Sequence, residues 1–167
     1  MISQKRLQEL LSYEPETGVF VRRLTRGPSI AGSVAGYTFW SKNSKGHKYI
    51  RMGIEGREYL AHRLAWLYVH GVWPADMIDH IDCDGTNNRI ANLREATNGQ
   101  NRANSKVTKP TSSGLKGVHW HKQNRRWVAA GRFQSKSRHI GIFDTKEEAA
   151  LAYQEFAKRN HGAFARF

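Results

Sequence analysis

The chain has 167 residues, 39% of them hydrophobic, enough for one ordinary domain or two small ones with packed cores. Its longest apolar run, residues 64–69, is too short to cross a bilayer, and the N-terminus lacks an apolar segment with a cleavage site, so neither a membrane span nor secretion is expected. The single cysteine, Cys83, excludes an internal disulfide and any four-cysteine zinc site. The 27 basic residues against 14 acidic ones give a net charge of +13, which suits a nucleic acid or an anionic membrane surface as partner. Binding to a membrane surface would require a basic amphipathic helix, which the sequence does not predict, so a nucleic acid is favoured.

The positive charge is unevenly distributed along the chain. Residues 1–75 carry a net charge of +6 and residues 106–167 a net charge of +9, whereas residues 76–105 carry −2. An acidic segment between two basic flanks is the pattern that a metal-dependent nuclease needs, because the flanks attract phosphates and the acidic residues can hold a cation. The alternative is that so short a segment is acidic by chance.

The N-terminal part of the chain predicts several short elements. Glu55-Gly56 lies between two alternating runs and indicates a tight hairpin turn, while Gly71 and Pro74 end a helix. The expected elements are a helix at residues 3–11 with Ser3 as its N-cap, a strand at 19–23, loops with short strands at 27–47, a hairpin of 47–54 with 57–61, and a helix at 62–70.

The remaining sequence predicts two further groups of elements around a linker. Residues 106–114 are polar, contain a proline and have linker composition, so we place the domain boundary there. Before them we expect strands at 77–81 and 92–96 joined by a polar loop, and a helix at 97–105 capped by Thr97; after them we expect strands at 117–121, 126–133 and 138–143 and a helix at 146–160. The predicted fold class is α+β, with the three-stranded antiparallel sheet packed on one helix.

Four polar residues of the acidic segment are candidates for chemistry. A hairpin followed by a helix brings Asp79, His80, Asn92 and Asn101 near one another. Because neighbours on a strand point to opposite faces, either one of Asp79 and His80 lies at the strand end or the two address opposite sides of a phosphate. Oxygen ligands suit a hard cation such as Mg²⁺, and a neutral histidine can take a proton from water. Together these residues predict metal-assisted phosphodiester hydrolysis.

The same segment resembles the HNH endonucleases of the phage and intron-homing branch. The resemblance lies in Asp79-His80, Asn92-Leu93-Arg94, Thr97 and Asn101, with Leu60-Ala61-His62-Arg63 and Trp73-Pro74 upstream, and it covers about residues 13–105. It implies that His80 is the general base, that Asp79 and Asn101 bind one Mg²⁺ or Mn²⁺ ion per active site, and that Asn92 fixes the loop between them. The third residue of the motif is often a histidine, and Asn101 occupies that position here. The homing branch commonly has an asparagine at this position.

Other interpretations of this segment are weaker or stay open. An EF-hand loop is not supported, because Asp82, Asp84 and Gly85 do not keep its spacing and no glutamate closes the loop. Cys83 is interpreted as a loop residue. His62 has two candidate roles: a structural one at the start of its helix, through capping or a hydrogen bond, or contact with a phosphate or leaving group.

The C-terminal segment resembles the plant ethylene-response-factor, or Apetala-type, DNA-binding domain. The resemblance lies in residues 117–121, 126–132, 139–145 and 147–153 and spans nearly all of 114–167. It implies a sheet whose outer face enters the major groove of double-stranded DNA. Alternation assigns Val118, Trp120, Trp127, Ala129 and Ile140 to the helix side with Phe143 at its edge, and Lys116, His119, His121, Val128, Ala130, Arg132, Ser137 and His139 to the outer face. The candidate DNA-binding residues are Lys116, His119, His121, Lys122, Arg125, Arg126, Arg132, Lys136, Arg138 and His139.

These observations predict a protein of two modules. Residues 1–61 form a basic N-terminal region with short strands and a hairpin, 62–105 an HNH ββα-metal nuclease core, 106–114 the linker, and 115–167 the Apetala-type domain. The expected function is a metal-dependent, homing-type DNA endonuclease with sequence-directed DNA binding by the C-terminal sheet. The alternative is a non-catalytic DNA-binding or regulatory protein that uses the HNH fold as a scaffold. We expect a cytoplasmic monomer, in the host-cell cytosol if a phage encodes it, that needs neither a membrane nor a small-molecule cofactor.

Overall fold

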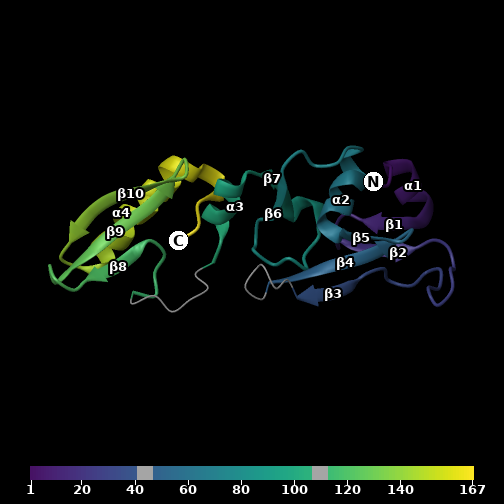
Figure 1. The fold of residues 1–167 in the computed structure, drawn as a ribbon, viewed down its shortest axis with the longest axis horizontal. Helices are drawn as coiled ribbons and strands as arrows, with labels where there is room; N and C mark the ends of the chain where they lie inside the picture. The colour runs from purple at the N-terminus through teal and green to yellow at the C-terminus, as the bar shows by residue number, and fades with distance from the viewer. Residues whose placement is uncertain (41–46, 107–112) are drawn as a thin grey trace. The chain divides into compact units, whose positions relative to one another are not determined.

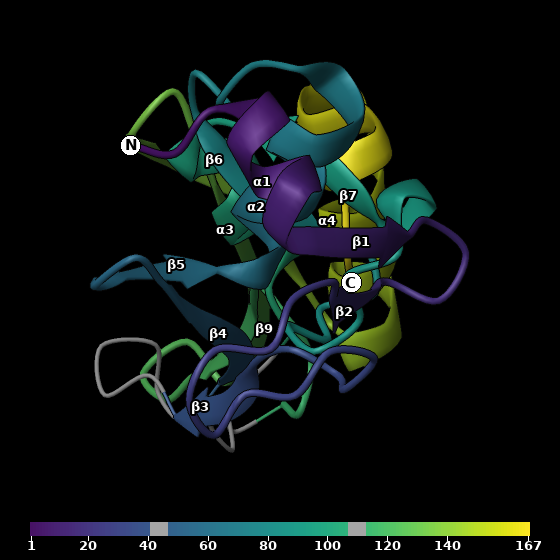
Figure 2. The ribbon, with the colours of Figure 1, turned by 90° about the vertical axis from the view of Figure 1, so that its right-hand side faces the viewer.

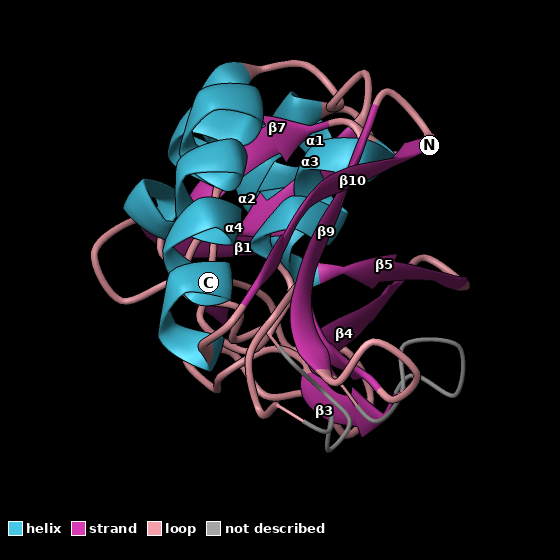
Figure 3. Ribbon diagram, turned by 90° about the vertical axis from the view of Figure 1, so that its left-hand side faces the viewer, coloured by secondary structure: helices cyan, strands magenta, loops and turns pink. Residues whose placement is uncertain are grey.

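The computed structural model describes residues 1–40, 47–106 and 113–167, and these residues form two compact units (Figure 1). The units are Met1–Glu95 and Ala96–Phe167. Helices and antiparallel strands occur in both units (Figure 3), which confirms the predicted α+β class. Most of the predicted linker at 106–114 lies outside the described residues, and the division between the units falls upstream of it. No helix in the described ranges has the length and apolarity needed to cross a membrane.

In its described residues, the first unit holds three small sheets and two α-helices. Its elements are α1 (Gln4–Leu10), β1 (Leu11–Glu14), β2 (Val19–Arg22), β3 (Tyr37–Trp40), β4 (Lys48–Ile54), β5 (Arg57–Leu60), α2 (Ala61–His70), β6 (Met77–His80), the 3₁₀ helix η2 (Ile90–Asn92) and β7 (Leu93–Ala96), whose last residue begins the second unit. The sheets are β1–β2, β3–β4–β5 and β6–β7. The predicted helices, the hairpin and the short strands are therefore present within about two residues of the expected bounds.

Local signals set the ends of these elements. The Ser3 hydroxyl accepts a hydrogen bond from the Arg6 N–H and caps α1, as predicted. Glu55 and Gly56 both have positive φ, 50° and 76°, which is the backbone of the tight turn that joins β4 to β5. Gly71, at φ 78°, ends α2 in the left-handed conformation that glycine adopts at least cost.

One apolar core holds the first unit together and fixes the strand that carries the candidate site. Phe20, Leu7, Leu64 and Leu67 are its largest fully buried side chains. Helices α1 and α2 lie side by side (Figure 2), and α2 also packs on β4 and β5. The core includes Ile78 of β6 and Leu93 of β7. Burial of residues on both strands therefore anchors the β6–β7 pair in the core to which α2 also contributes.

The second unit is a three-stranded antiparallel sheet packed on a long helix. Its elements are α3 (Asn98–Asn104), β8 (Val118–His121), β9 (Arg126–Phe133), β10 (Lys136–Phe143), α4 (Lys146–His161) and the 3₁₀ helix η3 (Gly162–Phe164), with strand order β10–β9–β8. Thr97 and Thr145 cap α3 and α4, each in a capping box. A Cβ on Gly131 would lie 2.3 Å from the Phe156 ring, so the sheet and α4 approach closely only because this position is glycine.

The two faces of this sheet follow simple alternation only in part. Val118 and Ala129 are buried on the helix side, as predicted. Val128, predicted to face outward, is also buried, in register with His119 of β8 and Ile142 of β10. The register shifts between His139 and Gly141, where β10 contains a β-bulge. The bulge breaks the alternation of β10, whereas the β8–β9 register that contains Val128 is unbroken.

Candidate active site

Two buried polar residues occupy the end of β6. Asp79 and His80 are 4% and 6% exposed, and His80 is the last residue of the strand. This is one of the two arrangements expected from the sequence, in which one member of the pair lies at the strand end. Burial of adjacent titratable side chains is costly unless partners compensate it, so their contacts define the site.

Asp79 forms an ion pair with Arg94 of β7. The Nε and Nη2 atoms of Arg94 each lie 2.9 Å from Oδ2 of Asp79. The Ile81 N–H donates to the Asn92 carbonyl, so Ile81 and Asn92 lie opposite each other. Because the strands run antiparallel, Asp79, two residues before Ile81, lies opposite Arg94, two residues after Asn92. No sequence pattern assigned a role to Arg94. Its ion pair with Asp79 could have been predicted only from the pairing of β6 with β7.

His80 is held through its Nε2 atom, which lies 3.3 Å from Oδ1 of Asn88. Burial lowers the pKa of His80 below its ordinary value, although the Asn88 hydrogen bond and the charges of Asp82, Asp79 and Asp84 act in the opposite direction. The imidazole is therefore kept neutral at neutral pH, the state in which a histidine accepts a proton.

A second buried histidine packs against the first. His62 lies in the first turn of α2, and its ring stands edge-to-face against that of His80, with centroids 4.9 Å apart. The Tyr49 ring lies 5.7 Å from His62 and 6.1 Å from His80. His62 does not cap the helix, because Leu60 is the N-cap and makes no side-chain cap bond. Its Nδ1 atom has no hydrogen-bond partner among the described residues, and contact with a phosphate stays a prediction.

The environment of His62 makes the stability of the fold depend on pH. Burial, together with the charges of His80 and Arg63, lowers the pKa of His62 from 6.5 to about 3. Above pH 6.5 neither the folded nor the unfolded state binds the proton; between 6.5 and 3 only the unfolded state does. We therefore expect the free energy of unfolding to fall by about 1.4 kcal/mol per pH unit as the pH drops from 6.5, with His80 adding to the slope.

Urea unfolding at pH 6.5, 5.5 and 4.5 measures this slope. The variant His62→Phe keeps a ring against Tyr49 and His80. It should lose the part of the pH dependence of the unfolding free energy that one titrating group contributes. His70→Phe, an exposed position of the same helix, should keep the wild-type slope. A His62→Phe variant as sensitive to acid as the wild type would show that His62 is not the buried group responsible.

The loop after β6 is organised around Asp82 and Asn92. The Asn92 Nδ2 atom donates to Asp82 Oδ1 at 3.0 Å and to the Asn87 carbonyl at 2.9 Å, while its Oδ1 accepts from the Asp82 N–H at 3.1 Å. Asn87 donates to the other carboxylate oxygen at 2.6 Å. Burial would raise the pKa of Asp82, but hydrogen bonds from Asp84, Asn92 and Asn87 lower it below its ordinary value. The loop thus uses this carboxylate as an acceptor for its own turns.

The donor atoms at this site fit a hard cation better than a soft one. Asp79 supplies a buried carboxylate, and Cys83, the single cysteine, lies in the loop. Within residues 1–40, 47–106 and 113–167, no group of three histidine, cysteine or acidic side chains is arranged to hold a metal. A sparse set of oxygen donors suits Mg²⁺, which keeps several waters, and does not suit four-coordinate Zn²⁺. Asn101, the second predicted ligand, lies on α3 in the other unit.

Two candidate DNA-binding residues of the second unit have intramolecular roles in the structure. The Lys116 ammonium donates to the carbonyls of Ala103 and Ser105 at the C-terminal end of α3, where a helix favours a cation. In this structure the Lys116 ammonium is thus bound within the unit, and its predicted contact with DNA stays a prediction. Arg126 forms an exposed ion pair with Asp144 at 2.8 Å.

Arg132, a third candidate DNA-binding residue, lies near the end of its strand. It is the penultimate residue of β9, beyond the part that pairs with β8, and its guanidinium donates to the Ser135 carbonyl at 3.1 and 3.2 Å. His119 and His121 are in register with Val128 and Arg126 instead. Arg132 and these histidines are therefore separated along the sheet.

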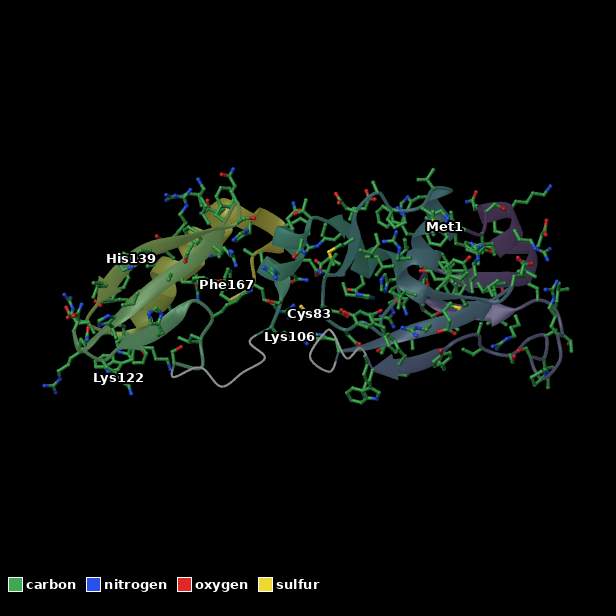
Figure 4. All side chains as sticks on the ribbon, in the orientation of Figure 1. Met1, Cys83, Lys106, Lys122, His139 and Phe167 are labelled. Atoms are coloured by element: carbon green, nitrogen blue, oxygen red, sulfur yellow. The ribbon has the colours of Figure 1, made fainter. Side chains whose placement is uncertain are left out.

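The remaining basic candidates lie on the surface of the second unit. Lys122 is in the turn after β8, and His139 is on β10 (Figure 4). His139, beside the bulge, lines a cavity of about 340 Å³ together with residues of α4, including Glu155 and Arg159. Alternation had assigned His139 to the outer face of the sheet, away from the helix. The other exposed candidates are Arg125, Lys136 and Arg138.

Comparison with known proteins places the site within a recognised domain. Residues 59–103 match the HNH endonuclease family. The chain is 35% identical to Protein 3.8 of Escherichia phage T7 over 107 residues, 64% of this chain and 88% of that protein. It is 37% identical over 106 residues to Uncharacterized HNH endonuclease L560 of Acanthamoeba polyphaga mimivirus, 62% of this chain and 54% of that protein. No solved structure matches. The matched segment includes the candidates Asp79, His80, Asn92 and Asn101.

Proposed function

Because the chain belongs to the same family as Protein 3.8 of Escherichia phage T7 and carries an HNH endonuclease domain at residues 59–103, we propose that it is a metal-dependent DNA endonuclease. The observation that carries the proposal is the buried Asp79-His80 pair at the end of β6, inside the matched segment. A neutral histidine beside a buried carboxylate unites the proton acceptor and the cation ligand that hydrolysis of a phosphodiester requires.

His80 acts as the general base. It takes a proton from a water molecule as the water oxygen bonds to phosphorus, and the bond from phosphorus to the leaving sugar oxygen breaks, that oxygen taking a proton from solvent. Asp79 and Asn101 would hold Mg²⁺ or Mn²⁺, Asn101 being retained for its residue type and the family resemblance. The cation, when bound, polarises the phosphate and stabilises charge on the leaving oxygen.

Asn92 has a supporting part in this proposal. Its three hydrogen bonds to Asp82 and Asn87 join the two ends of the loop that follows His80. A loop closed in this way restricts the end of β6, where His80 lies. Asn92 is therefore proposed to hold the site in shape and to take no part in proton transfer.

The second unit is proposed to bind double-stranded DNA, as an Apetala-type domain of a homing-type nuclease. The segment 106–167 carries a net charge of +9, which favours contact with phosphates and predicts affinity that falls steeply with salt. The proposed contacts are His119, His121, Lys122, Arg125, Arg126, Arg132, Lys136, Arg138 and His139. Lys116 is also proposed as a contact, and it would have to leave its bonds at the end of α3 to reach DNA.

Cleavage under control of metal tests the endonuclease proposal. The protein is incubated with plasmid DNA in Mg²⁺, in excess EDTA, and in EDTA followed by excess Mg²⁺ or Mn²⁺. We expect cutting in the first sample, background only in the second and restored cutting in the third. Cutting that survives EDTA would remove the metal from the mechanism. DNA binding without cutting under any of these conditions would support the non-catalytic alternative.

A further inference from the structure

Asn88, to which the sequence analysis gave no role, is one of the most deeply buried polar residues of the first unit. It is 2% exposed. The Tyr13 hydroxyl donates to its backbone carbonyl at 2.7 Å. The turn between β1 and β2 closes on it at Gly18, where an added Cβ would lie 2.4 Å from the Asn88 carbonyl carbon. The N-terminal hairpin therefore fixes the backbone of a residue in the loop after β6.

Two hydrogen bonds determine which way the Asn88 amide points. Its Nδ2 atom donates to the Thr86 carbonyl at 3.1 Å. A carbonyl can only accept, so the amide nitrogen must face Thr86 and the amide oxygen must face the other way. That oxygen, Oδ1, lies 3.3 Å from Nε2 of His80. An amide oxygen has no hydrogen to give, so the hydrogen in this contact belongs to Nε2 of His80.

The contact therefore selects one form of the neutral imidazole. A neutral histidine carries a hydrogen on one ring nitrogen and a lone pair on the other. With the hydrogen on Nε2, the lone pair lies on Nδ1. We propose that Asn88 is a positioning residue, which fixes the tautomer and the ring orientation of His80 so that Nδ1 takes the proton from the attacking water. This inference rests on the proposed function, in which His80 is the general base.

The role proposed for Asn88 differs from that of Asn92. Asn92 bonds to Asp82 and Asn87 and acts on the shape of the loop. Asn88 bonds directly to the His80 ring. Removing the Asn88 acceptor should therefore change which ring nitrogen of His80 carries the hydrogen, as well as the rate of DNA cleavage. Loss of a merely structural contact would leave the tautomer unchanged.

The tautomer can be read without DNA or metal. Long-range proton–nitrogen NMR spectra of the full chain with ¹⁵N-labelled histidine distinguish the two neutral forms, and His80→Ala identifies the His80 signals by their loss. We expect the Nε2–H form in the wild type. Asn88→Leu, which has a similar volume and no acceptor, should move His80 toward the Nδ1–H form or a mixture. Asn88→Asp, which keeps an oxygen acceptor, should retain the Nε2–H form. An unchanged tautomer in Asn88→Leu would overturn the proposal.

Cleavage kinetics give the second measurement. For Asn88→Leu we expect kcat to fall on the order of 10- to 100-fold, the usual range for loss of an orienting partner, with KM nearly unchanged. Asn88→Asp should recover most of this loss. Gln8→Leu, which removes an exposed amide on α1, should cut like the wild type. A wild-type kcat in Asn88→Leu would contradict the proposal. If thermal melting shows that this variant does not fold, Asn88→Ala is measured by both methods in its place.

The His80→Ala variant separates the two levels of inference. If it cuts DNA at the wild-type rate, the assignment of His80 as the base fails and the role of Asn88 fails with it. If it loses activity while Asn88→Leu keeps the wild-type kcat and tautomer, the proposed function stands and the inference about Asn88 alone is wrong.

Discussion

Replacement of His80 with alanine is expected to lower the rate of DNA cleavage by about 100-fold or more, the usual scale for loss of a general base. The imidazole is buried, its Nε2 atom lies 3.3 Å from Oδ1 of Asn88, and its lowered pKa keeps a lone pair available at neutral pH, which alanine cannot supply. The rate should be measured with enzyme in excess over DNA, so that the cutting step is observed without product release.

Binding and folding controls make this result interpretable. DNA affinity, measured in EDTA by fluorescence anisotropy, should be nearly unchanged in His80→Ala, because a residue that is 6% exposed contributes little to phosphate binding. His70→Ala removes an exposed histidine from α2 and should cut at the wild-type rate. If His80→Ala cuts as fast as His70→Ala, another residue is the base.

The elements of this fold could be predicted where a local signal defines them. Ser3, Gly71, Thr97 and Thr145 each lie at the helix end that the sequence predicts, because capping depends on residues three or four positions away. The same holds for the β4–β5 hairpin, whose turn residues set its register. Such signals also place Asp79 and His80 on a strand, followed by a polar loop.

The partners of the site residues could not be predicted in this way. Arg94 meets Asp79 only because two four-residue strands pair in one register. Asn88 reaches His80 because Tyr13, 75 residues earlier in the chain, bonds to its backbone. The ring of His62 meets that of His80 through the packing of α2. These contacts depend on the tertiary fold, which no local pattern specifies.

The second unit shows a different limit of sequence interpretation. Alternation predicts the buried pair Val118 and Ala129 correctly, but it cannot anticipate the bulge in β10 or the burial of Val128. A basic residue also has more than one use. Lys116 is conspicuous as a candidate phosphate contact, and its ammonium binds instead to carbonyls at the end of α3. Charge alone therefore predicts a nucleic-acid partner better than it predicts the individual contacts.

Removal of the guanidinium opposite Asp79 should have the largest effect on stability. Asp79 is 4% exposed, and Arg94 places two nitrogens 2.9 Å from one of its carboxylate oxygens. Loss of one partner from a buried ion pair leaves a charge that is both desolvated and poorly compensated, at a cost of about 3–5 kcal/mol. We therefore expect Arg94→Met to lower the free energy of unfolding by about that amount at neutral pH.

Denaturant unfolding of four proteins tests this expectation and shows which charge is responsible. Arg89→Met changes an exposed arginine in the same segment and should stay within about 0.5 kcal/mol of the wild type. The double variant Asp79→Asn with Arg94→Met should recover part of the loss, because a neutral amide is cheaper to bury than a carboxylate.

In the Arg94→Met protein, Mg²⁺ should raise the melting temperature more than it does in the wild type, since a cation bound at Asp79 would supply the missing positive charge. An Arg94→Met variant as stable as Arg89→Met would show that the ion pair contributes little, and an equal shift with Mg²⁺ in both proteins would argue against Asp79 as the ligand.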